Sequence, residues 1–330
     1  MKNNIYDVTI IGLGNIGLLY DLEEESNSEV FLSHTRSVFS HKNFEIKYLI
    51  DIDPKKLSLA KKKYGDQIEY KTELGEDYLG TDIVVLASIP SVNSYYLNRL
   101  KSIDLVKIFL IEKPFLIENE KVKDYYKIIE KSYLNYFRKT LPFFKNLKKE
   151  IDNKLFGNLI TINIYYTKGL INNGSHLIDL LNYFFGSNYD LNSIKIIKHK
   201  NDYSLSDKSV SFCVNYNYNQ NPFLVIFNCL DERIFNLIEL DMIFEKQRFR
   251  IFDSGSKIQT YKLNKNKAFK KYKTMSPTKL IDSKLNTYGK HIYDTIRNII
   301  NGKEENNSTL LNENDVKVLR DAVIDKINEK

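Results

Sequence analysis

The first 140 residues alternate between short apolar runs and amphipathic stretches. Near-continuous apolar runs such as Ile83–Ala87 are typical of strands buried on both faces of a parallel sheet. Strands are predicted at 6–11, 44–50, 82–87 and 107–112, with helices after Gly14, from Pro54 to Tyr64 and from Ser91 to Leu100. A further helix at about 119–132 and a strand at 133–137 would complete the sheet. This alternation predicts a Rossmann-type α/β domain over residues 1–140.

The pattern changes after residue 140. A helix at 142–153 and a strand at 158–166 lead into a loop and an amphipathic helix over residues 169–181. Strand-like runs follow at 192–198, 208–216, 222–229, 235–243, 247–252 and 257–263, and several alternate apolar and polar residues as a half-covered sheet does. Two helices close the chain, the last from about Glu313. Residues 141–330 are therefore predicted to form a second, α+β domain.

Composition supports two globular domains. The chain has 330 residues, 42% of them hydrophobic, and no stretch approaches the roughly 18 apolar residues that a membrane helix needs. A strand begins within a few residues of the N-terminus, which leaves no room for a signal peptide. Cys213 and Cys229 are interpreted as buried small hydrophobic residues in a reducing compartment. We expect a cytoplasmic protein that binds no membrane.

The net charge of +7 does not by itself predict a nucleic-acid partner. Lysines are spread along the whole chain and mixed with acidic residues, and no helix-turn-helix, zinc finger or RNP-like pattern is present. Nucleic acid is therefore not expected as a partner. A mild basic surplus would help to attract a phosphorylated substrate. No cluster of residues predicts a metal site.

The most informative motif is the run from Tyr6 to Gly17, where a β-branched strand enters a glycine turn and then a helix start. The first glycine, Gly12, permits the tight turn, and the second, Gly14, lets the backbone approach a pyrophosphate. The third, Gly17, lets helix and strand pack closely, while the helix N-terminus offers free N–H groups to the anion. This is the pattern of a dinucleotide site. The alternative is an ordinary glycine-rich turn.

One feature departs from that fingerprint. The acidic residue expected about 20 positions after the glycines arrives later, at Asp51, because a polar segment at 21–29 separates the first helix from the second strand. This segment is either a solvated surface loop or a flap near the cofactor. His34 is expected to open a short helix that follows it.

Two further places carry candidate chemistry. Glu112-Lys113-Pro114 follows a strand at its carboxyl end, where ligands bind in α/β sheets, and a partly desolvated lysine there can stabilise a forming alkoxide. The alternative is a capped turn. His176 and Asp179 lie three apart on a predicted helix and share a face. An imidazole can take a hydroxyl proton as hydride leaves the same carbon, but such a histidine can equally be a structural one.

Taken together, these motifs carry a resemblance. The glycine fingerprint, Asp51-Ile-Asp-Pro, Ser88-Ile-Pro, Glu112-Lys-Pro and Gly174-Ser-His-Leu-Ile-Asp occur in the order and rough spacing of one family. Over nearly its whole length the chain resembles the Gfo/Idh/MocA oxidoreductases, the glucose–fructose oxidoreductase and inositol dehydrogenase group. The resemblance implies a C-terminal domain with a large, open, mostly antiparallel sheet, and NAD(P)-dependent hydride transfer on sugars or cyclitols. It also implies homo-oligomers, dimers or tetramers, built through that sheet, and a Lys-Pro peptide bond that is often cis.

The resemblance also assigns roles to residues. Lys113 becomes the catalytic lysine and His176 the acid/base, while Asp51 binds the ribose and favours NAD over NADP, because a 2′-phosphate would meet like charge. The implied cofactor-binding residues are Gly12, Gly14, Asn15, Ile16, Gly17, Asp51, Ser88, Pro90 and Glu112. The implied substrate-binding residues are Asn172, Asp179, Lys168 and Arg138.

Two departures from the family pattern leave alternatives open. Asn172 stands where the family often has an aspartate, and Asn93 or Ser94 stands where it has a histidine. The first hypothesis is an NAD-dependent oxidoreductase that acts on a nucleotide-activated or phosphorylated sugar, in bacterial surface-glycan precursor synthesis. The alternatives are a non-catalytic NAD-binding regulator or scaffold, and a reductase of a non-sugar substrate such as an imine.

Overall fold

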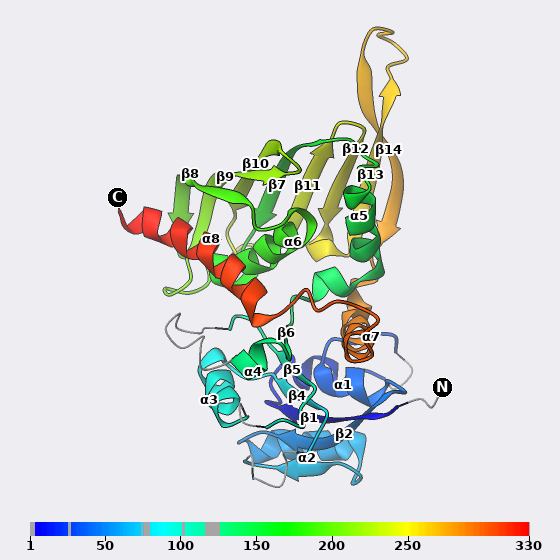
Figure 1. The fold of residues 1–330 in the computed structure, drawn as a ribbon, viewed down its shortest axis with the longest axis vertical. Coiled ribbons are helices and arrows are strands. Elements are labelled where there is room, and N and C mark those ends of the chain that lie inside the picture. The colour runs from blue at the N-terminus through cyan, green and yellow to red at the C-terminus, as the bar shows by residue number, and fades with distance from the viewer. Residues whose placement is uncertain are drawn as a thin grey trace. The chain divides into compact units, whose positions relative to one another are not determined.

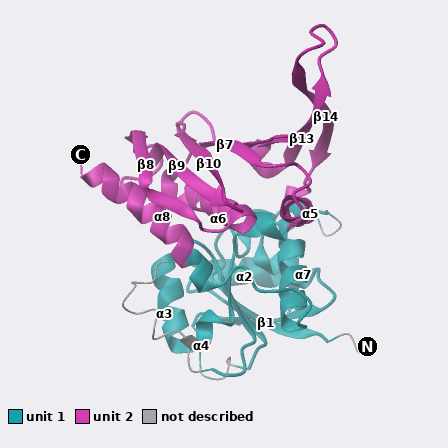
Figure 2. Ribbon diagram, turned by 45° about the horizontal axis from the view of Figure 1, so that its top comes forward, with its two compact units in different colours: residues 1–140, 286–313 teal, residues 141–285, 314–330 magenta. Residues whose placement is uncertain are grey.

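The chain folds into two compact units. The computed structural model describes residues 4–25, 28–73, 75, 80–100, 103–115 and 126–329. Unit 1 comprises residues 1–140 and 286–313, and unit 2 comprises residues 141–285 and 314–330 (Figure 2). The chain therefore leaves unit 1 at residue 140 and returns to it for a helix and a connecting segment before its last helix.

Unit 1 is built on a parallel sheet of six strands in the order β3-β2-β1-β4-β5-β6 (Figure 1). All its strand pairs are parallel, and the order reverses direction between β1 and β4. In such a doubly wound sheet, ligands bind outside the carboxyl ends of the strands at this switch point. The predicted Rossmann-type α/β domain is confirmed. The strands are β1 (Tyr6–Ile11), β2 (Phe44–Ile50), β3 (Glu69–Lys71), β4 (Ile83–Leu86), β5 (Ile108–Ile111) and β6 (Ser132–Leu134).

The helices of unit 1 follow the predicted alternation in part. The predicted helix at 54–64 is confirmed: Pro54 occupies its first turn and the Asp53 side chain accepts a hydrogen bond from the Lys55 N–H group. His34 opens a short helix, as predicted. Of the predicted helix at 119–132, residues 119–125 lie outside the described part, and the remainder is helical only over four residues. The helices are α1 (His34–Phe39), α2 (Pro54–Tyr64), α3 (Pro90–Leu100), α4 (Tyr126–Ile129) and α7 (Tyr288–Ile300).

The predicted helix after Gly14 is wrong, because residues 14–21 contain no α-helix. The chain makes a single turn, closed by a hydrogen bond from the Leu18 N–H group to the Gly14 carbonyl, and a short 3-10 segment over Leu19–Asp21 ends it. The Asp21 carboxylate is fully buried and accepts hydrogen bonds from the backbone N–H groups of Leu32 and Ser33. Because these bonds pull the chain back toward α1, the helix cannot continue.

In its described residues, the polar segment at 21–29 is accordingly a tethered loop and not merely a solvated one. The Lys63 ammonium donates to three of its backbone carbonyls, and the Arg36 guanidinium donates to the carbonyls of Glu25, Ser28 and Val30. Arg36 is 3% exposed, so its charge depends on these carbonyl dipoles for the solvation that water would give. Two cations therefore hold this loop against α1 and α2.

Unit 2 is built on an eight-stranded sheet in the order β14-β13-β12-β11-β7-β10-β9-β8 (Figure 1). Every pair is antiparallel except β7 with β10, which confirms the large, mostly antiparallel sheet that the resemblance implies. The strands are β7 (Leu159–Tyr166), β8 (Tyr189–Lys200), β9 (Ser209–Tyr218), β10 (Asn221–Cys229), β11 (Ile238–Phe244), β12 (Gln247–Phe252), β13 (Lys257–Lys265) and β14 (Lys273–Asp282).

Helices cover one face of this sheet, and none of the described helices of unit 2 covers the other face. Figure 1 shows α5 (Pro142–Asp152), α6 (Ser175–Phe185) and α8 (Leu310–Asn328) on the same side of the strands. The covered face is rich in aromatic rings; those of Phe212 and Phe227 stack with centroids 4.4 Å apart. None of the helices in the described ranges is long and apolar enough to cross a membrane.

Candidate functional site

The glycine turn at the end of β1 is shaped by two glycines that the fold itself requires. Gly12 has φ = +97°, and a Cβ atom there would lie 2.4 Å from Ser88 Oγ and 2.8 Å from the Ala87 carbonyl carbon. A Cβ atom on Gly17 would lie 2.0 Å from the Gly12 carbonyl oxygen. Both positions therefore exclude any side chain, one by backbone conformation and both by close approach.

Gly14 differs, because nothing in the described chain requires it to be glycine. A Cβ atom there would have no described heavy atom within 4 Å, and its φ lies outside the left-handed region. The open space lies beside a pocket of about 550 Å³ at the carboxyl ends of β1, β2 and β4. Since the protein itself does not fill the space beside Gly14, the absence of a side chain there would allow a ligand to approach the backbone of the turn closely.

Most of the predicted cofactor-binding residues meet around this pocket. Gly17, Pro90 and Glu112 do not line it: Gly17 packs behind the turn, and Pro90 begins α3. The lining side chains that the sequence interpretation missed include Tyr20, Lys56, Val92 and Tyr96. The predicted residues that line the pocket are Gly12, Gly14, Asn15, Ile16, Asp51 and Ser88.

Asp51 stands at the end of β2, where the resemblance places a ribose-binding acid. Its Oδ2 accepts a hydrogen bond from the Leu13 N–H group at 2.6 Å, and its Oδ1 accepts one from the Asp53 N–H group at 2.9 Å. The Lys56 ammonium lies 3.3 Å from Oδ2 and 3.4 Å from Oδ1. Asp51 thus fixes the glycine turn from the neighbouring strand, and Lys56 places a cation beside it that sequence spacing did not single out.

Asn93, which with Ser94 marks one departure from the family pattern, has a structural role. It is fully buried, its Oδ1 accepts a hydrogen bond from the Ser88 N–H group at 3.1 Å, and its Nδ2 donates to the Ser88 carbonyl at 3.0 Å. The Asn93 amide thus satisfies both backbone hydrogen-bonding groups of Ser88, as a neighbouring strand would, and fixes the loop between β4 and α3. Asn93, one of the two residues at the position of the family's histidine, therefore shapes the pocket wall by fixing Ser88.

Glu112 is held by a buried network directly before Lys113. Its Oε1 lies 2.9 Å from His34 Nε2 and accepts a second hydrogen bond from the Asn135 amide, while His34 Nδ1 lies 3.0 Å from the Tyr293 hydroxyl. His34 is 3% exposed. The burial of Tyr293, together with the nearby Glu112, raises the pKa of Tyr293 well above its usual value. Because a carboxylate only accepts, His34 Nε2 donates the hydrogen bond to Glu112.

Lys113 itself is half-buried at the carboxyl end of β5, and its peptide bond to Pro114 is cis, as the resemblance implied. The network beneath it draws on α1 and α7, which lie far from β5 in sequence. No spacing rule connects His34 or Tyr293 with Glu112, so the sequence offered no signal for them.

In unit 2 a π-helical turn, Gly169–Gly174, leads into α6 and carries Asn172. The Asp207 carboxylate accepts hydrogen bonds from the N–H groups of Ile171 at 2.8 Å and Asn172 at 2.9 Å. A Cβ atom on Gly169, which has φ = +79°, would lie 2.1 Å from Asp207 Oδ2. The loop between β8 and β9 therefore clamps the turn through a buried acid that the sequence did not single out.

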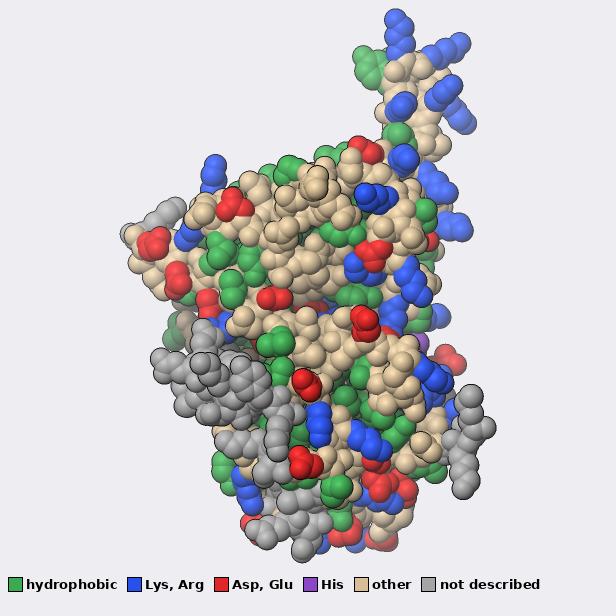
Figure 3. All heavy atoms as spheres, in the orientation of Figure 1, with side chains coloured by type: hydrophobic (Ala, Val, Ile, Leu, Met, Phe, Trp, Pro, Cys, Tyr) green, Lys and Arg blue, Asp and Glu red, His purple; other side chains and the backbone are tan. Residues whose placement is uncertain are grey.

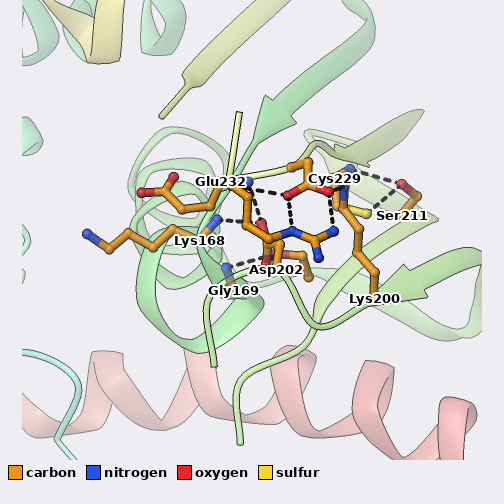
Figure 4. A network of polar contacts seen from close by, with 10 residues as sticks. Lys168, Gly169, Lys200, Asp202, Ser211, Cys229 and Glu232 are labelled. Carbon is orange, nitrogen blue, oxygen red and sulfur yellow. Dashed lines mark hydrogen bonds and ion pairs between the residues drawn. The ribbon is translucent and has the colours of Figure 1, made fainter. Parts of the chain in front are cut away.

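A second buried acid anchors the start of that turn. Asp202 Oδ2 accepts from the N–H groups of Lys168 at 3.2 Å and Glu232 at 3.0 Å, and its Oδ1 accepts from the Ser209 hydroxyl at 2.6 Å (Figure 4). The Lys168 side chain points away from this network in Figure 4, and its ammonium lies 5.0 Å from the centroid of the Tyr203 ring. The backbone is fixed and the charged tip is presented outward.

The remaining predicted residues have contrasting surroundings. His176 and Asp179 lie one turn apart on α6, as predicted, and are 8% and 4% exposed. Arg138 belongs to the 3-10 segment Phe137–Thr140 of unit 1, where it is 5% exposed and its guanidinium lies 4.8 Å from the centroid of the Phe137 ring. Burial lowers the pKa of Arg138 to about 10. Its burial sets it apart from an open phosphate-binding arginine.

The protein thus has two units. One is a Rossmann unit with an open glycine turn, and the other is built on a mostly antiparallel sheet. No family model and no curated protein matches the sequence. Solved structures do match it. The WlbA dehydrogenase from Bordetella pertussis, determined with NADH and UDP-GlcNAcA, is 13% identical with a TM-score of 0.71, over 100% of this chain and 97% of that chain.

Two other matches extend the comparison. A Gfo/Idh/MocA family oxidoreductase from Vibrio cholerae is 13% identical with a TM-score of 0.68, over 98% of each chain. The super-repressor mutant of Gal80p from Saccharomyces cerevisiae is 13% identical with a TM-score of 0.70, over 97% of this chain and 95% of that chain. The chain therefore has the two-domain fold of the Gfo/Idh/MocA oxidoreductases, which confirms the predicted resemblance at the level of the fold.

Proposed function

We propose that the chain is an NAD-dependent oxidoreductase that interconverts a carbinol and a keto group on a nucleotide-activated or phosphorylated sugar. The observation that carries this proposal is the space over Gly14, which the protein leaves open at the switch point of the sheet. The fold shared with the dehydrogenases described above supports the same reaction class.

The residues around the pocket fit a dinucleotide. The backbone N–H groups at the start of the turn from Gly14 would bind the pyrophosphate, and Asp51 would accept hydrogen bonds from ribose hydroxyls. A carboxylate has about four acceptor positions, and the Leu13 and Asp53 N–H groups use two of those on Asp51. Ribose hydroxyls would take the places now facing Lys56. Bound NAD supplies the hydride acceptor, and a charged acid at this position disfavours the 2′-phosphate of NADP.

The proton chemistry falls to two side chains. His176 accepts the hydroxyl proton of the sugar through its imidazole, and Asp179, one turn away on the same helix, orients the ring. Lys113 stabilises the negative charge that develops on the same oxygen. Asn172 hydrogen-bonds a neighbouring hydroxyl but cannot accept a proton, so the proton leaves through His176. The outward-pointing Lys168 is the cation we assign to a substrate phosphate, since Arg138 is buried.

The substrate class rests on chemistry and on one neighbour. WlbA was determined with UDP-GlcNAcA, which supports a nucleotide sugar as substrate. The place in the synthesis of bacterial surface-glycan precursors is proposed from the family resemblance alone. We also propose that the open face of the eight-stranded sheet joins copies of the chain into a dimer or tetramer. Ile160 and Tyr165 are 55% and 40% exposed on that sheet. Ultracentrifugation of the native protein and of Ile160→Glu tests this arrangement.

One experiment separates the enzyme from its alternatives. Native protein is titrated with NADH and then incubated with NAD and a panel of sugar phosphates and nucleotide sugars, while absorbance of the reduced nicotinamide is followed. We expect turnover that falls by orders of magnitude in Lys113→Met and in His176→Ala with NADH affinity unchanged. Lys62→Met, an exposed change on α2, serves as the matched control.

The second candidate is a non-catalytic NAD-binding regulator. Asn172 in place of an acid and the structural use of Asn93 favour it, and the super-repressor mutant of Gal80p shares the fold. NADH binding without reduction across the sugar panel would support the regulator. Reduction of NAD only with imines or non-sugar hydroxy compounds would keep the enzyme and replace the substrate. Unchanged turnover in both variants would overturn the roles given to Lys113 and His176.

A further inference from the structure

The hairpin formed by β13 and β14 concentrates the positive charge of the whole chain. Residues 257–281 contain eight lysines and no acidic residue, whereas the rest of the chain balances 41 lysines and arginines against 42 acidic residues. The prediction that lysines are mixed with acids throughout is therefore wrong for this hairpin, which we call the basic arm. Figure 1 shows its outer half running beyond the neighbouring strands, and Figure 3 shows basic side chains around it.

Strand pairing places two lysines of the arm next to each other. Lys265 and Lys273 are directly opposite each other in the antiparallel register, an arrangement that destabilises a strand pair unless an anion relieves it. Within the described residues, Lys257 is the arm lysine that forms an ion pair, with Asp282 at the base of the arm. Its outer lysines are exposed to solvent. The arm therefore suits an external polyanion.

Two exposed aromatic rings lie in the turn that connects the two strands of the arm. Phe269 and Tyr272 are 66% and 67% exposed, and their rings pack edge to face with centroids 6.2 Å apart. The turn that presents them is closed: Asn266 Oδ1 accepts from the N–H groups of Ala268 and Phe269, and the Asn266 N–H group donates to the Tyr272 carbonyl. A built turn thus exposes two large apolar surfaces between lysines.

We propose that the basic arm docks the protein on an anionic lipid surface, with the Phe269 and Tyr272 rings at the boundary between headgroups and acyl chains. The Tyr272 ring is apolar with a polar hydroxyl and the Phe269 ring is wholly apolar, so both suit that boundary, and lysines near it are attracted to lipid phosphates while their alkyl stems cover apolar surface. This peripheral contact requires no membrane-spanning helix. It also does not depend on the oxidoreductase proposal, because the arm carries none of the residues assigned to that chemistry.

Other anionic partners fit these observations less well. A second copy of the chain offers no acidic excess outside its own arm, since the remainder is balanced in charge. A nucleic acid strand is bound in a basic groove whose aromatic side chains stack on successive bases, whereas the two rings here pack against each other in one exposed turn. The lipid surface uses both the charge along the arm and the apolar tip.

Flotation of the full-length protein with vesicles tests the proposal. We expect binding to phosphatidylcholine vesicles that contain phosphatidylglycerol, little binding to pure phosphatidylcholine, and a partition coefficient that falls as salt is added. Replacing Lys265, Lys267, Lys270 and Lys271 together by Gln should reduce binding at least tenfold. The matched control replaces four exposed lysines outside the arm, Lys62, Lys149, Lys290 and Lys303, by Gln.

A fluorescent reporter tests insertion of the tip. The chain contains no tryptophan, so Tyr272→Trp introduces a single indole whose emission should shift to the blue when anionic vesicles are added. Absence of that shift would overturn insertion. Failure of the native protein to float with anionic vesicles, an equal loss in the control quadruple variant, or binding to RNA in place of vesicles would overturn the proposal. NADH titration and thermal melting of each variant show that unit 1 and the fold remain intact.

Discussion

Gly14 and Gly17 offer the sharpest test of the dinucleotide site, because the same substitution has opposite expected effects at positions three residues apart. In Gly14→Ala the new methyl group meets no described atom within 4 Å, whereas in Gly17→Ala it would lie 2.0 Å from the Gly12 carbonyl oxygen. The first substitution changes only the space offered to a ligand. The second changes the fold of the turn.

The magnitudes follow from these distances. Gly14→Ala should leave the free energy of unfolding unchanged or raise it by about 0.4–1 kcal/mol, because alanine restricts the unfolded chain. Gly17→Ala should lower it by about 1–3 kcal/mol through overpacking. A methyl group at Gly14 would hold the pyrophosphate away from the turn and weaken at least one charge-assisted hydrogen bond, worth about 1.5–3 kcal/mol. Since 1.4 kcal/mol is about a factor of ten, NADH should bind roughly ten to a hundred times more weakly.

Two measurements on each variant suffice. Quenching or enhancement of NADH fluorescence gives the dissociation constant, and thermal denaturation without ligand gives the stability. The reasoning is refuted if Gly14→Ala binds NADH as tightly as the native protein, since the open space would then have no connection with the cofactor. A loss of stability in Gly14→Ala would also refute it, because the turn would then be packed in a way that the structure does not show.

Three further predictions concern buried side chains. Tyr64 is buried, its hydroxyl has no hydrogen-bond partner among the described residues, and burial raises its pKa from 10.0 to about 12. The folded state is thus fully favoured below pH 10 and loses about 2 kcal/mol between pH 10 and 12, so Tyr64→Phe should unfold at higher pH in an alkaline titration. His34→Gln should lower the melting temperature and turnover while NADH affinity is kept; an unchanged turnover would limit the His34–Glu112 pair to stability. Asp207→Asn should raise the substrate KM by loosening the turn at Asn172, and equal KM values in steady-state kinetics would contradict this.

The sequence predicted the elements whose signal is local. Continuous apolar runs located β1, β2, β4 and β5, and Pro54 with its capping aspartate located α2. The sequence interpretation missed β3, which has three residues, and β14, which contains Pro277 and mostly exposed residues. Such strands are held by pairing with a neighbour, and their own side chains carry little hydrophobic pattern.

Among the residues that shape the site, only those that belong to a recognisable sequence motif could be predicted. Gly12, Gly14 and Asp51 belong to such a motif, and the structure brings them to one pocket. The partners that position the motif residues are separated from them by long stretches of chain: His34 lies 78 residues from Glu112 and 259 from Tyr293, and Asp207 lies 35 from Asn172. Only the folded topology makes these neighbours.

The basic arm shows a different reason why a sequence interpretation fails. A net charge of +7 spread over 330 residues suggests a weakly basic surface, yet a balance of charges over the whole chain says nothing of where each sign lies. Strand pairing brings Lys265 opposite Lys273 and leaves the turn between them in solvent, so the lysines of residues 257–281 gather on one hairpin. The electrostatic property that matters to a partner is therefore the local density of charge, which the hairpin creates and the composition does not reveal.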